Sequence, residues 1–382
     1  MKLLIKNAKI ITPYEIIENY SVAIENGKIA DLMEKKYVKE SMFDEVIDAK
    51  GNYLSPGFID IHCHGANGFE VMEGNFVALE NIARFHLKNG VTGFLAAVMT
   101  APLEKIKDSV KNIIGYILSQ KPESIFKEKS QLLGIYLEGP YFSISKKGAQ
   151  PEQYLRTPNK EELESILKDS HDLIKVVSIA PELDGSDEII KLLRERKIVV
   201  AIGHSDAKFD EAKKAIRCGA GLATHTFNGM RNFNYREPGI VEAVLSDDRV
   251  YCELIADCIH VHPVTIGLLV KIKGVEKIIL VSDSMMAAGL SDGEYTLSGQ
   301  KVEVKNGRAT LSDGTLAGST LTLNKAIYNM VYTVGVALKD AVRMATLNPA
   351  KMLGLSHKGS IEIGKDAELI IFDEKINILK VI

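Results

Sequence analysis

Tryptophan is absent from this 382-residue sequence, and aromatic residues together make up only 7% of it. This shortage of flat side chains disfavours a stacking platform for single-stranded nucleic acid. An excess of one charge sign is also missing, because 47 Lys and Arg residues face 50 Asp and Glu residues for a net charge of −3. The sequence therefore has no overall basic character for binding nucleic acid or an anionic membrane. A small anionic ligand held by a few local cations remains compatible with this balance.

Cysteine is scarce and scattered. Cys63, Cys218, Cys252 and Cys258 form no CxxC pair, which excludes a disulfide framework and a thiolate zinc site. No stretch approaches the roughly eighteen uninterrupted apolar residues of a membrane span. The N-terminal stretch interleaves Lys with apolar residues and lacks the continuous apolar core of a secretory signal. We therefore expect a soluble, cytoplasmic protein.

Short apolar runs alternate with amphipathic helical segments through most of the chain. The runs are nearly continuous in Val, Ile, Leu and Ala, as is typical of parallel strands buried on both faces: Gly57–His64, Gly93–Met99, Leu132–Glu138, Ile174–Ala180, Ile198–His204, Leu222–Phe227, Tyr251–His260 and Lys277–Asp283. Ser186–Lys197 is the clearest helix between them, with Ser186 as the expected N-cap. About eight such units predict an α/β fold of the (β/α)8 barrel type. The alternative, an open doubly wound sheet, is weakened because no glycine-rich phosphate loop follows the early strands.

Both ends of the chain instead contain clusters of β-forming residues separated by turns, which predict short β-strands. These segments are Leu3–Thr12, Ser21–Ile24 and Lys28–Met33 near the N-terminus, and Gly359–Ile363 and Ala367–Asp373 near the C-terminus. We predict that residues 1–54 and 350–382 together form a small β-sandwich domain, and that residues 55–349 form the barrel.

The histidines fall at informative positions. Five of the nine lie at or near the C-terminal end of a predicted strand, namely His62, His64, His204, His225 and His260. In barrel enzymes this rim carries the chemistry, because the loops that leave the strands converge there. We interpret the other four, His86, His171, His262 and His357, as surface or structural residues.

A metal site is the hypothesis that best explains these positions. His62 and His64 point to the same face of a strand and can reach one metal ion, although a hydrogen-bonded pair at a strand end is the alternative. Glu138 ends an apolar run, where a carboxylate is costly unless it is paired or metal-bound. With His204 and His225, these residues predict a hydrolytic metal site, binuclear if Glu138 bridges two ions. Each residue taken alone is equally a helix cap or a satisfied core group.

Asp283 ends the last apolar run. A carboxylate beside a metal-activated water can take its proton as a general base and later deliver it to a leaving group. The alternatives are a further metal ligand or an N-cap.

Eight motifs then occur in order: PGFIDIHCHG (56–65), LEGPYF (137–142), GHSDA (203–207), THTFNGM (224–230), REPG (236–239), ADCIHVHP (256–263), LVSDSM (280–285) and TLAGS (315–319). Together with GSIEIGKDAELIIFD (359–373), they closely resemble the N-acetylglucosamine-6-phosphate deacetylases of the amidohydrolase superfamily over almost the whole chain. The first motif alone indicates only an amidohydrolase. LEGP, THTFNGM with REPG, and ADCIHVHP narrow the resemblance to the deacetylases.

This resemblance implies metal-dependent hydrolysis of the acetamide of N-acetyl-D-glucosamine 6-phosphate, in amino-sugar catabolism. It implies one or two divalent ions, with zinc expected and Fe, Ni, Co or Mn as alternatives. The implied ligands are His62, His64, Glu138, His204 and His225, and the pair His62 and His64, which some members lack, implies capacity for a second ion. Asp283 matches the catalytic acid/base. The implied substrate contacts are Asn228, Gly229 and Arg236 for the phosphate, and His260, Ala149, Gln150, Leu316, Ala317 and Gly318 for the sugar.

Two positions depart from the family pattern. Gln150 stands where many members have histidine, so an amide would replace any imidazole role there, and Cys258 replaces a frequent glycine. We interpret Cys258 as a buried small apolar residue, and Arg236 taken alone is equally a surface salt-bridge residue. The alternative functions are N-acetylgalactosamine-6-phosphate deacetylation, a dihydroorotase-like activity, or a non-catalytic sugar-phosphate-binding regulator. We expect a homodimer or homotetramer that binds neither nucleic acid nor membrane.

Overall fold

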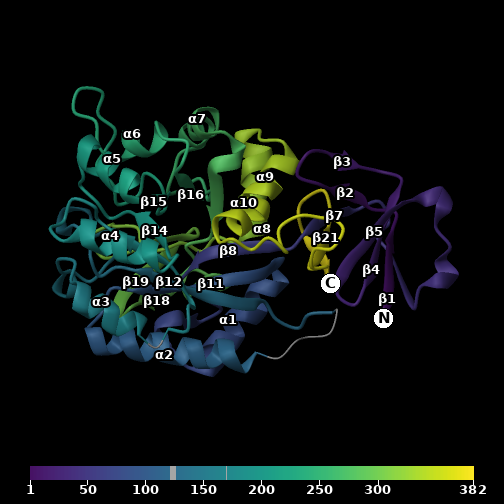
Figure 1. Ribbon diagram of the computed structural model, residues 1–382, viewed down its shortest axis with the longest axis horizontal. Helices are drawn as coiled ribbons and strands as arrows, with labels where there is room; N and C mark the ends of the chain where they lie inside the picture. Colours follow the sequence, from purple (N-terminus) through teal and green to yellow (C-terminus); the bar gives the residue numbers. More distant parts are fainter. Residues whose placement is uncertain (121–125, 169) are drawn as a thin grey trace.

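The central element of the fold is a parallel eight-stranded sheet (Figure 1). The structure is a computed structural model and describes residues 1–120, 126–168 and 170–382. The strands are β8 (Phe58–Cys63), β11 (Val91–Met99), β12 (Gln131–Glu138), β13 (Ile174–Ile179), β14 (Val199–Ile202), β15 (Ala220–Ala223), β16 (Tyr251–Ile255) and β17 (Ile278–Val281). They neighbour one another in chain order. The predicted (β/α)8 barrel is confirmed.

Each barrel strand is followed by a helix that covers the sheet. In chain order these are α1 (Phe76–Lys88), α2 (Leu103–Ser119), α3 (Lys160–Leu167), α4 (Ser186–Glu195), α5 (Phe209–Cys218), α6 (Ile240–Leu245), α7 (Pro263–Lys273) and α8 (Leu323–Asn329). In α4 the apolar stripe Ile189, Ile190 and Leu193 is buried, and the acidic residues lie in the first turn, where the helix dipole favours them. The predicted N-cap is wrong, because Gly185 takes that position and the Ser186 hydroxyl donates to the Ala180 carbonyl.

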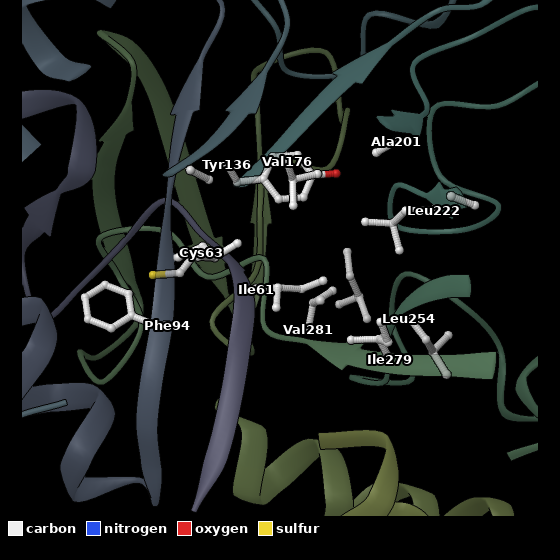
Figure 2. Packing of buried hydrophobic residues seen from close by; sticks show 14 of the residues in the cluster. Ile61, Cys63, Phe94, Tyr136, Val176, Ala201, Leu222, Leu254, Ile279 and Val281 are labelled. Atoms are coloured by element: carbon white, nitrogen blue, oxygen red, sulfur yellow. The ribbon is translucent and has the colours of Figure 1, made fainter. Parts of the chain in front are cut away.

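The barrel core consists of apolar side chains from neighbouring strands (Figure 2). Ile61, Tyr136, Val176, Leu222 and Leu254 come from different strands, and each is fully buried. Such continuous burial explains why the strands read as unbroken apolar runs rather than alternating patterns.

The first and last strands meet at their C-terminal ends. The amide of Asp283 donates to the carbonyl of His62 over 2.9 Å, and the amide of His64 donates to the carbonyl of Ser284 over 2.8 Å. Cys63 and Ser284 form an isolated parallel bridge. This closure places two segments that are more than two hundred residues apart in sequence side by side at the rim.

Both chain ends form a second, smaller β structure beside the barrel (Figure 1). One sheet has the order β5-β4-β1-β6, from Lys28–Glu34, Tyr20–Glu25, Lys2–Lys6 and Glu45–Asp48. The other has the order β22-β21-β7-β2-β3, from Ile378–Val381, Leu369–Phe372, Tyr53–Pro56, Lys9–Ile11 and Ile16–Ile17. Leu3, Val22, Leu54 and Leu369 contribute to one buried cluster between the sheets. The proposed domain limits stay predictions, and they fall inside β7 and inside the helix α10 (Leu347–Met352).

Three details of the predicted strands are wrong. Leu3–Thr12 is split by Asn7, which has φ 55°. Gly359–Ile363 forms no strand, and the residue that follows it, Gly364, donates its amide to the carbonyl of Ile29 in β5. The sequence did not predict the three-stranded antiparallel sheet that follows β17, which consists of β18 (Gly293–Leu297), β19 (Gln300–Lys305) and β20 (Arg308–Thr310).

Among the described ranges, no helix combines the length and the apolar character needed to cross a bilayer.

Candidate metal centre and substrate pocket

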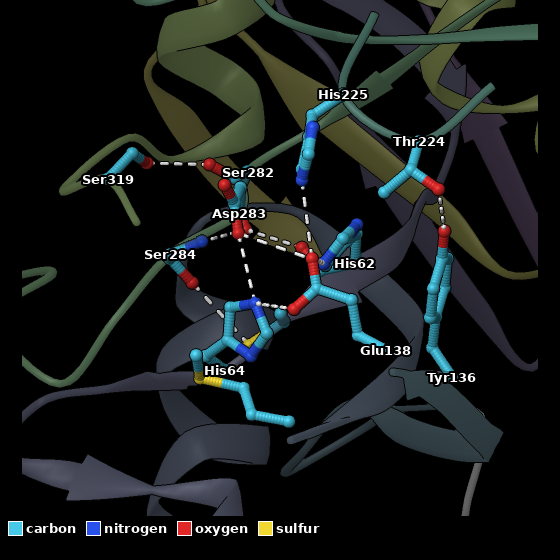
Figure 3. A network of polar contacts seen from close by, with 12 residues as sticks. His62, His64, Tyr136, Glu138, Thr224, His225, Ser282, Asp283, Ser284 and Ser319 are labelled. Atoms are coloured by element: carbon cyan, nitrogen blue, oxygen red, sulfur yellow. Dashed lines mark hydrogen bonds and ion pairs between the residues drawn. The ribbon is translucent and has the colours of Figure 1, made fainter. Parts of the chain in front are cut away.

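The predicted metal ligands meet at the C-terminal rim of the barrel around Glu138, the last residue of β12. Figure 3 shows Glu138 with His62, His64 and His225. One Glu138 carboxylate oxygen, Oε1, lies 3.3 Å from His204 Nε2, 3.3 Å from His225 Nε2 and 3.4 Å from His62 Nε2. The other, Oε2, lies 3.5 Å from His64 Nε2. Two sets of possible metal-ligating atoms therefore share Glu138: His62 with His64, and His204 with His225.

These side chains fit a divalent cation. His62 Nε2 is fully buried and has no hydrogen-bond partner among the described residues. His204 Nε2 and His225 Nε2 face each other at 3.0 Å. Imidazole nitrogens that converge on a carboxylate, with one nitrogen left unpaired in a buried position, are costly for a protein unless a cation joins them. Neutral imidazoles and a carboxylate are the donors that zinc and related ions prefer.

Contacts on the far side of the rings fix the orientation of three of the four imidazoles. His204 Nδ1 lies 2.8 Å from the Lys146 carbonyl, and His225 Nδ1 lies 3.1 Å from the Asn228 carbonyl. His62 Nδ1 lies 3.0 Å from Oε2 of Glu253. An acceptor at Nδ1 keeps the proton there and leaves the Nε2 lone pair facing the metal position.

Asp283 stands directly beside this cluster. Its Oδ1 lies 3.1 Å from His64 Nε2 and 3.8 Å from His62 Nε2, and its side chain is 10% exposed. Burial alone would raise the pKa of Asp283, but the hydrogen bond with His64 and the nearby imidazoles of His62 and His225 lower that pKa to about 2. Asp283 is therefore held as a carboxylate, the form that accepts a proton. The pKa of Glu138 is likewise well below its ordinary value, because the surrounding histidines outweigh the effect of burial.

The backbone is strained where these residues leave their strands. His204, His225 and Asp283 each lie two residues beyond the end of a strand and have φ values of 45°, 27° and 48°. Left-handed backbone at a residue with a Cβ atom costs on the order of 1–3 kcal/mol and is concentrated at functional sites. The three turns point these side chains toward the candidate metal centre, whereas a straight strand would point them in other directions.

A pocket opens above this centre and contains most of the predicted substrate contacts. Its lining includes Ala149, Gln150, Asn228, Gly229, His260, Leu316 and Gly318, together with His64, Glu138, His204, His225 and Asp283. Ala317 lies between two of these residues but is fully buried and does not line the pocket. His62 lies beneath the pocket and is also fully buried.

Arg236 does not line the pocket of its own chain. It lies in an exposed loop after β15 and stacks on Tyr235, with its guanidinium carbon 5.0 Å from the ring centroid. Phe233 and Tyr235 in the same loop are 64% and 79% exposed. The predicted phosphate role of Arg236 stays a prediction.

Gln150 contacts the carboxylate that the two sets of candidate metal ligands share, and it also lines the pocket. Its Nε2 donates to Oε2 of Glu138 over 2.6 Å, and its Oε1 accepts the Thr100 amide over 3.1 Å. Gln150 therefore orients the shared carboxylate and is 2% exposed. Cys258, the other departure from the family pattern, is only half-buried, so its interpretation as a buried residue is wrong. Its φ of 65° explains why a glycine is acceptable there.

Two further acidic residues near the centre were not predicted. Glu253 lies within β16 and contacts His62, and Asp257 lies 2.6 Å from His260 Nδ1 through its Oδ2. The signal for Glu253 was a charge inside an apolar run, whereas Glu138 was identified because it ends its run. Met99, Leu297 and Thr315 also line the pocket. They were not predicted as contacts, although Thr315 lies in the TLAGS motif (315–319).

Comparison with known proteins agrees with this geometry. A family model described as the amidohydrolase family matches residues 53–382. The chain is 37% identical over 378 residues to N-acetylglucosamine-6-phosphate deacetylase of Bacillus subtilis (strain 168), covering 99% of this chain and 94% of that protein. It is 35% identical over 382 residues to N-acetylgalactosamine-6-phosphate deacetylase of Escherichia coli O157:H7, covering 100% and 98%. The crystal structure of N-acetylglucosamine-6-phosphate deacetylase from Pasteurella multocida matches with a TM-score of 0.93 at 34% identity, covering 100% and 98%.

Proposed function

Because the chain belongs to the amidohydrolase family, we propose that it hydrolyses the acetamide of N-acetyl-D-glucosamine 6-phosphate in amino-sugar catabolism. The products are D-glucosamine 6-phosphate and acetate. The relative from Bacillus subtilis is named for this deacetylation, and it matches 99% of the chain. The observation that carries the chemistry is the shared carboxylate of Glu138, which lies between 3.3 and 3.5 Å from four imidazole nitrogens, with Asp283 beside them.

Metal-assisted amide hydrolysis is the reaction that this constellation supports. A divalent ion held by the two sets around Glu138 would lower the pKa of a water molecule and polarise the amide carbonyl. Zinc is the ion we propose, because buried imidazole and carboxylate donors suit it. Asp283 takes the proton of the attacking water and then returns a proton to the departing amine. Its low pKa means that it enters the reaction ionised.

His260 contacts the substrate from the pocket wall. Its Nδ1 lies 2.6 Å from Asp257, which fixes the ring and leaves Nε2 as the nitrogen available to a ligand. A sugar hydroxyl and the acetyl oxygen are the two groups it can contact. We favour His260 over Gln150 for this contact, because Gln150 already bonds with Glu138 and with the Thr100 amide.

The phosphate is bound at the other end of the sugar by the Asn228–Gly229 segment and by Arg236. The first two residues line the pocket, whereas Arg236 lies in the exposed loop of its own chain. We propose that the chain forms a homodimer or homotetramer in which Arg236 reaches the phosphate. Guanidinium is suited to this role because its planar fork matches the phosphate oxygens.

Acetate release from a panel of phosphosugars tests the proposal. The panel contains N-acetylglucosamine 6-phosphate, its galactosamine epimer, and unphosphorylated N-acetylglucosamine, because the relative from Escherichia coli is named for the epimer. We expect the highest kcat/KM for the glucosamine phosphate. The absence of acetate release from both phosphosugars, in protein loaded with metal, would refute the proposed function.

A further inference from the structure

Glu253 is a fully buried carboxylate at the back of the metal cluster. It lies in β16, and neither its side chain nor that of His62 is exposed. Its Oε2 lies 3.0 Å from His62 Nδ1 and accepts the backbone amide of His225 over 2.9 Å. Its Oε1 has no hydrogen-bond partner among the described residues.

The fold itself does not account for this charge. Among the ion pairs of the described residues, Glu253 contacts no Lys or Arg, and His62 is its only partner. A buried carboxylate with a free oxygen is unfavourable for the fold unless a positive charge lies nearby. The flanking residues Cys252 and Leu254 are buried and apolar, so an apolar side chain at position 253 would suit the strand better.

The Nδ1 partner of His62 differs in charge from the Nδ1 partners of His204 and His225. The Nδ1 atoms of His204 and His225 contact neutral backbone carbonyls, whereas Nδ1 of His62 contacts the carboxylate of Glu253. His64 Nδ1 has no hydrogen-bond partner among the described residues. Among the described residues, Glu253 is therefore the one carboxylate that contacts an Nδ1 nitrogen of the set His62, His64 and Glu138. A carboxylate behind a metal-binding imidazole fixes the tautomer and raises the basicity of the ring.

We propose that Glu253 is a positioning residue that enables His62, His64 and Glu138 to hold a second divalent cation. It does so by holding the His62 ring with Nε2 toward Glu138 and by adding one negative charge behind that ring. The set made of Glu138, His204 and His225 depends on it less, because Glu253 touches only the backbone amide of His225 there. This inference rests on the proposed metal-dependent function, but it concerns metal binding rather than turnover.

The test is a titration of metal-free enzyme with Zn²⁺, followed by calorimetry and by elemental analysis of the washed protein. We expect wild type to bind two equivalents. Glu253→Gln should keep one tight equivalent and bind the second about 10–100-fold more weakly, as is typical when an outer partner of a metal ligand is removed. Glu253→Asp, which keeps the charge but retracts it from His62, should weaken the second equivalent less than Glu253→Gln does.

Asp60→Asn is the matched control. Asp60 is also fully buried, and its Oδ1 accepts the backbone amide of His62 over 3.2 Å, but it does not contact the imidazole. This variant should bind two equivalents with wild-type affinities. Thermal melts of the metal-free variants show which of them fold. If Glu253→Gln does not fold, its place in the titration is taken by Glu253→Asp.

The proposal is overturned if Glu253→Gln binds both ions as tightly as wild type, or if wild type binds only one. It is also overturned if Asp60→Asn loses the second ion equally, because that result would reflect a general effect of buried charge. Acetate release by wild type is measured on the same sample. Its absence would refute the proposed function and would leave the metal-binding result standing.

Discussion

Replacing Asp283 with asparagine removes the proposed proton acceptor with little change in shape. The backbone bonds of residue 283, to the His62 carbonyl over 2.9 Å and from the Ser319 amide over 2.7 Å, do not involve its side chain. The asparagine oxygen can still accept from His64, which lies 3.1 Å from Oδ1. Asp283 belongs to neither set of ligands around Glu138. We therefore expect the variant to fold and to bind metal as wild type does.

The expected loss is in kcat. A positioned general acid or base contributes about 10²–10⁴-fold, which corresponds to about 3–5 kcal/mol at about 1.4 kcal/mol per factor of ten. Asp283 is assigned both proton transfers, and its carboxylate is the only acidic group of the described pocket lining apart from Glu138. We therefore expect a loss near the upper end of that range, of about 10³-fold or more.

The assay measures acetate release at saturating substrate, with metal content and melting temperature determined on the same protein. Asp187→Asn, a carboxylate-to-amide change in the exposed first turn of α4, is the control and should keep wild-type turnover. If Asp283→Asn retains turnover within about tenfold of wild type, which is less than a general base contributes, the assigned role is refuted.

Four other predictions concern different parts of the molecule. Gln150→Ala should lower metal content. It should also destabilise the fold by about 1–3 kcal/mol, measured by chemical denaturation, because it leaves the Thr100 amide unpaired. Unchanged stability and metal content would contradict this prediction. Asp257→Asn should lower kcat/KM without changing metal content, because the Asp257 side chain contacts His260 and the Ile259 amide, neither of which belongs to the candidate metal centre; loss of metal would contradict this. Arg236→Ala should raise KM for the phosphosugar and leave the kinetics on unphosphorylated N-acetylglucosamine nearly unchanged, whereas equal losses would exclude a phosphate role. Glu368→Gln should destabilise the protein by about 2 kcal/mol at neutral pH, because Glu368 pairs with two lysines; a difference in stability from wild type that does not change with pH would contradict this pairing.

The sign of the pH effect at Glu368 follows from its surroundings. Burial opposes ionisation there, but Lys127 and Lys358 outweigh it and lower the pKa of Glu368. A pKa that is lower in the folded state stabilises the fold above the unfolded value, which is about 4.3 for glutamate. This contribution is lost as the pH falls through the folded pKa. The difference in stability between wild type and Glu368→Gln should therefore shrink below about pH 4.

Much of the barrel was predictable because its strands are buried on both faces. Runs such as Leu132–Glu138 and Ile174–Ala180 coincide with β12 and β13 almost residue for residue. Strand ends were less predictable where an apolar run continues into a loop. Tyr251–His260 extends five residues beyond β16, which ends at Ile255, because Ala256–His260 is apolar enough to resemble a strand while Cys258 turns the backbone.

The candidate site was predictable where a polar residue ends an apolar run. His62, Glu138 and Asp283 meet at the rim because parallel strands of a barrel all end there. Glu253 was missed since it lies inside its run rather than at the end. The position of Arg236 outside the pocket depends on the path of a long exposed loop, which no local pattern of the sequence encodes.

The proposed deacetylation of an amino-sugar phosphate depends on a metal ion held around Glu138. The most direct test measures acetate release from N-acetylglucosamine 6-phosphate by one preparation before chelation, after removal of metal, and after addition of Zn²⁺. We predict that activity disappears with the metal and returns as zinc is bound. Full activity in protein shown by elemental analysis to be metal-free would contradict the account.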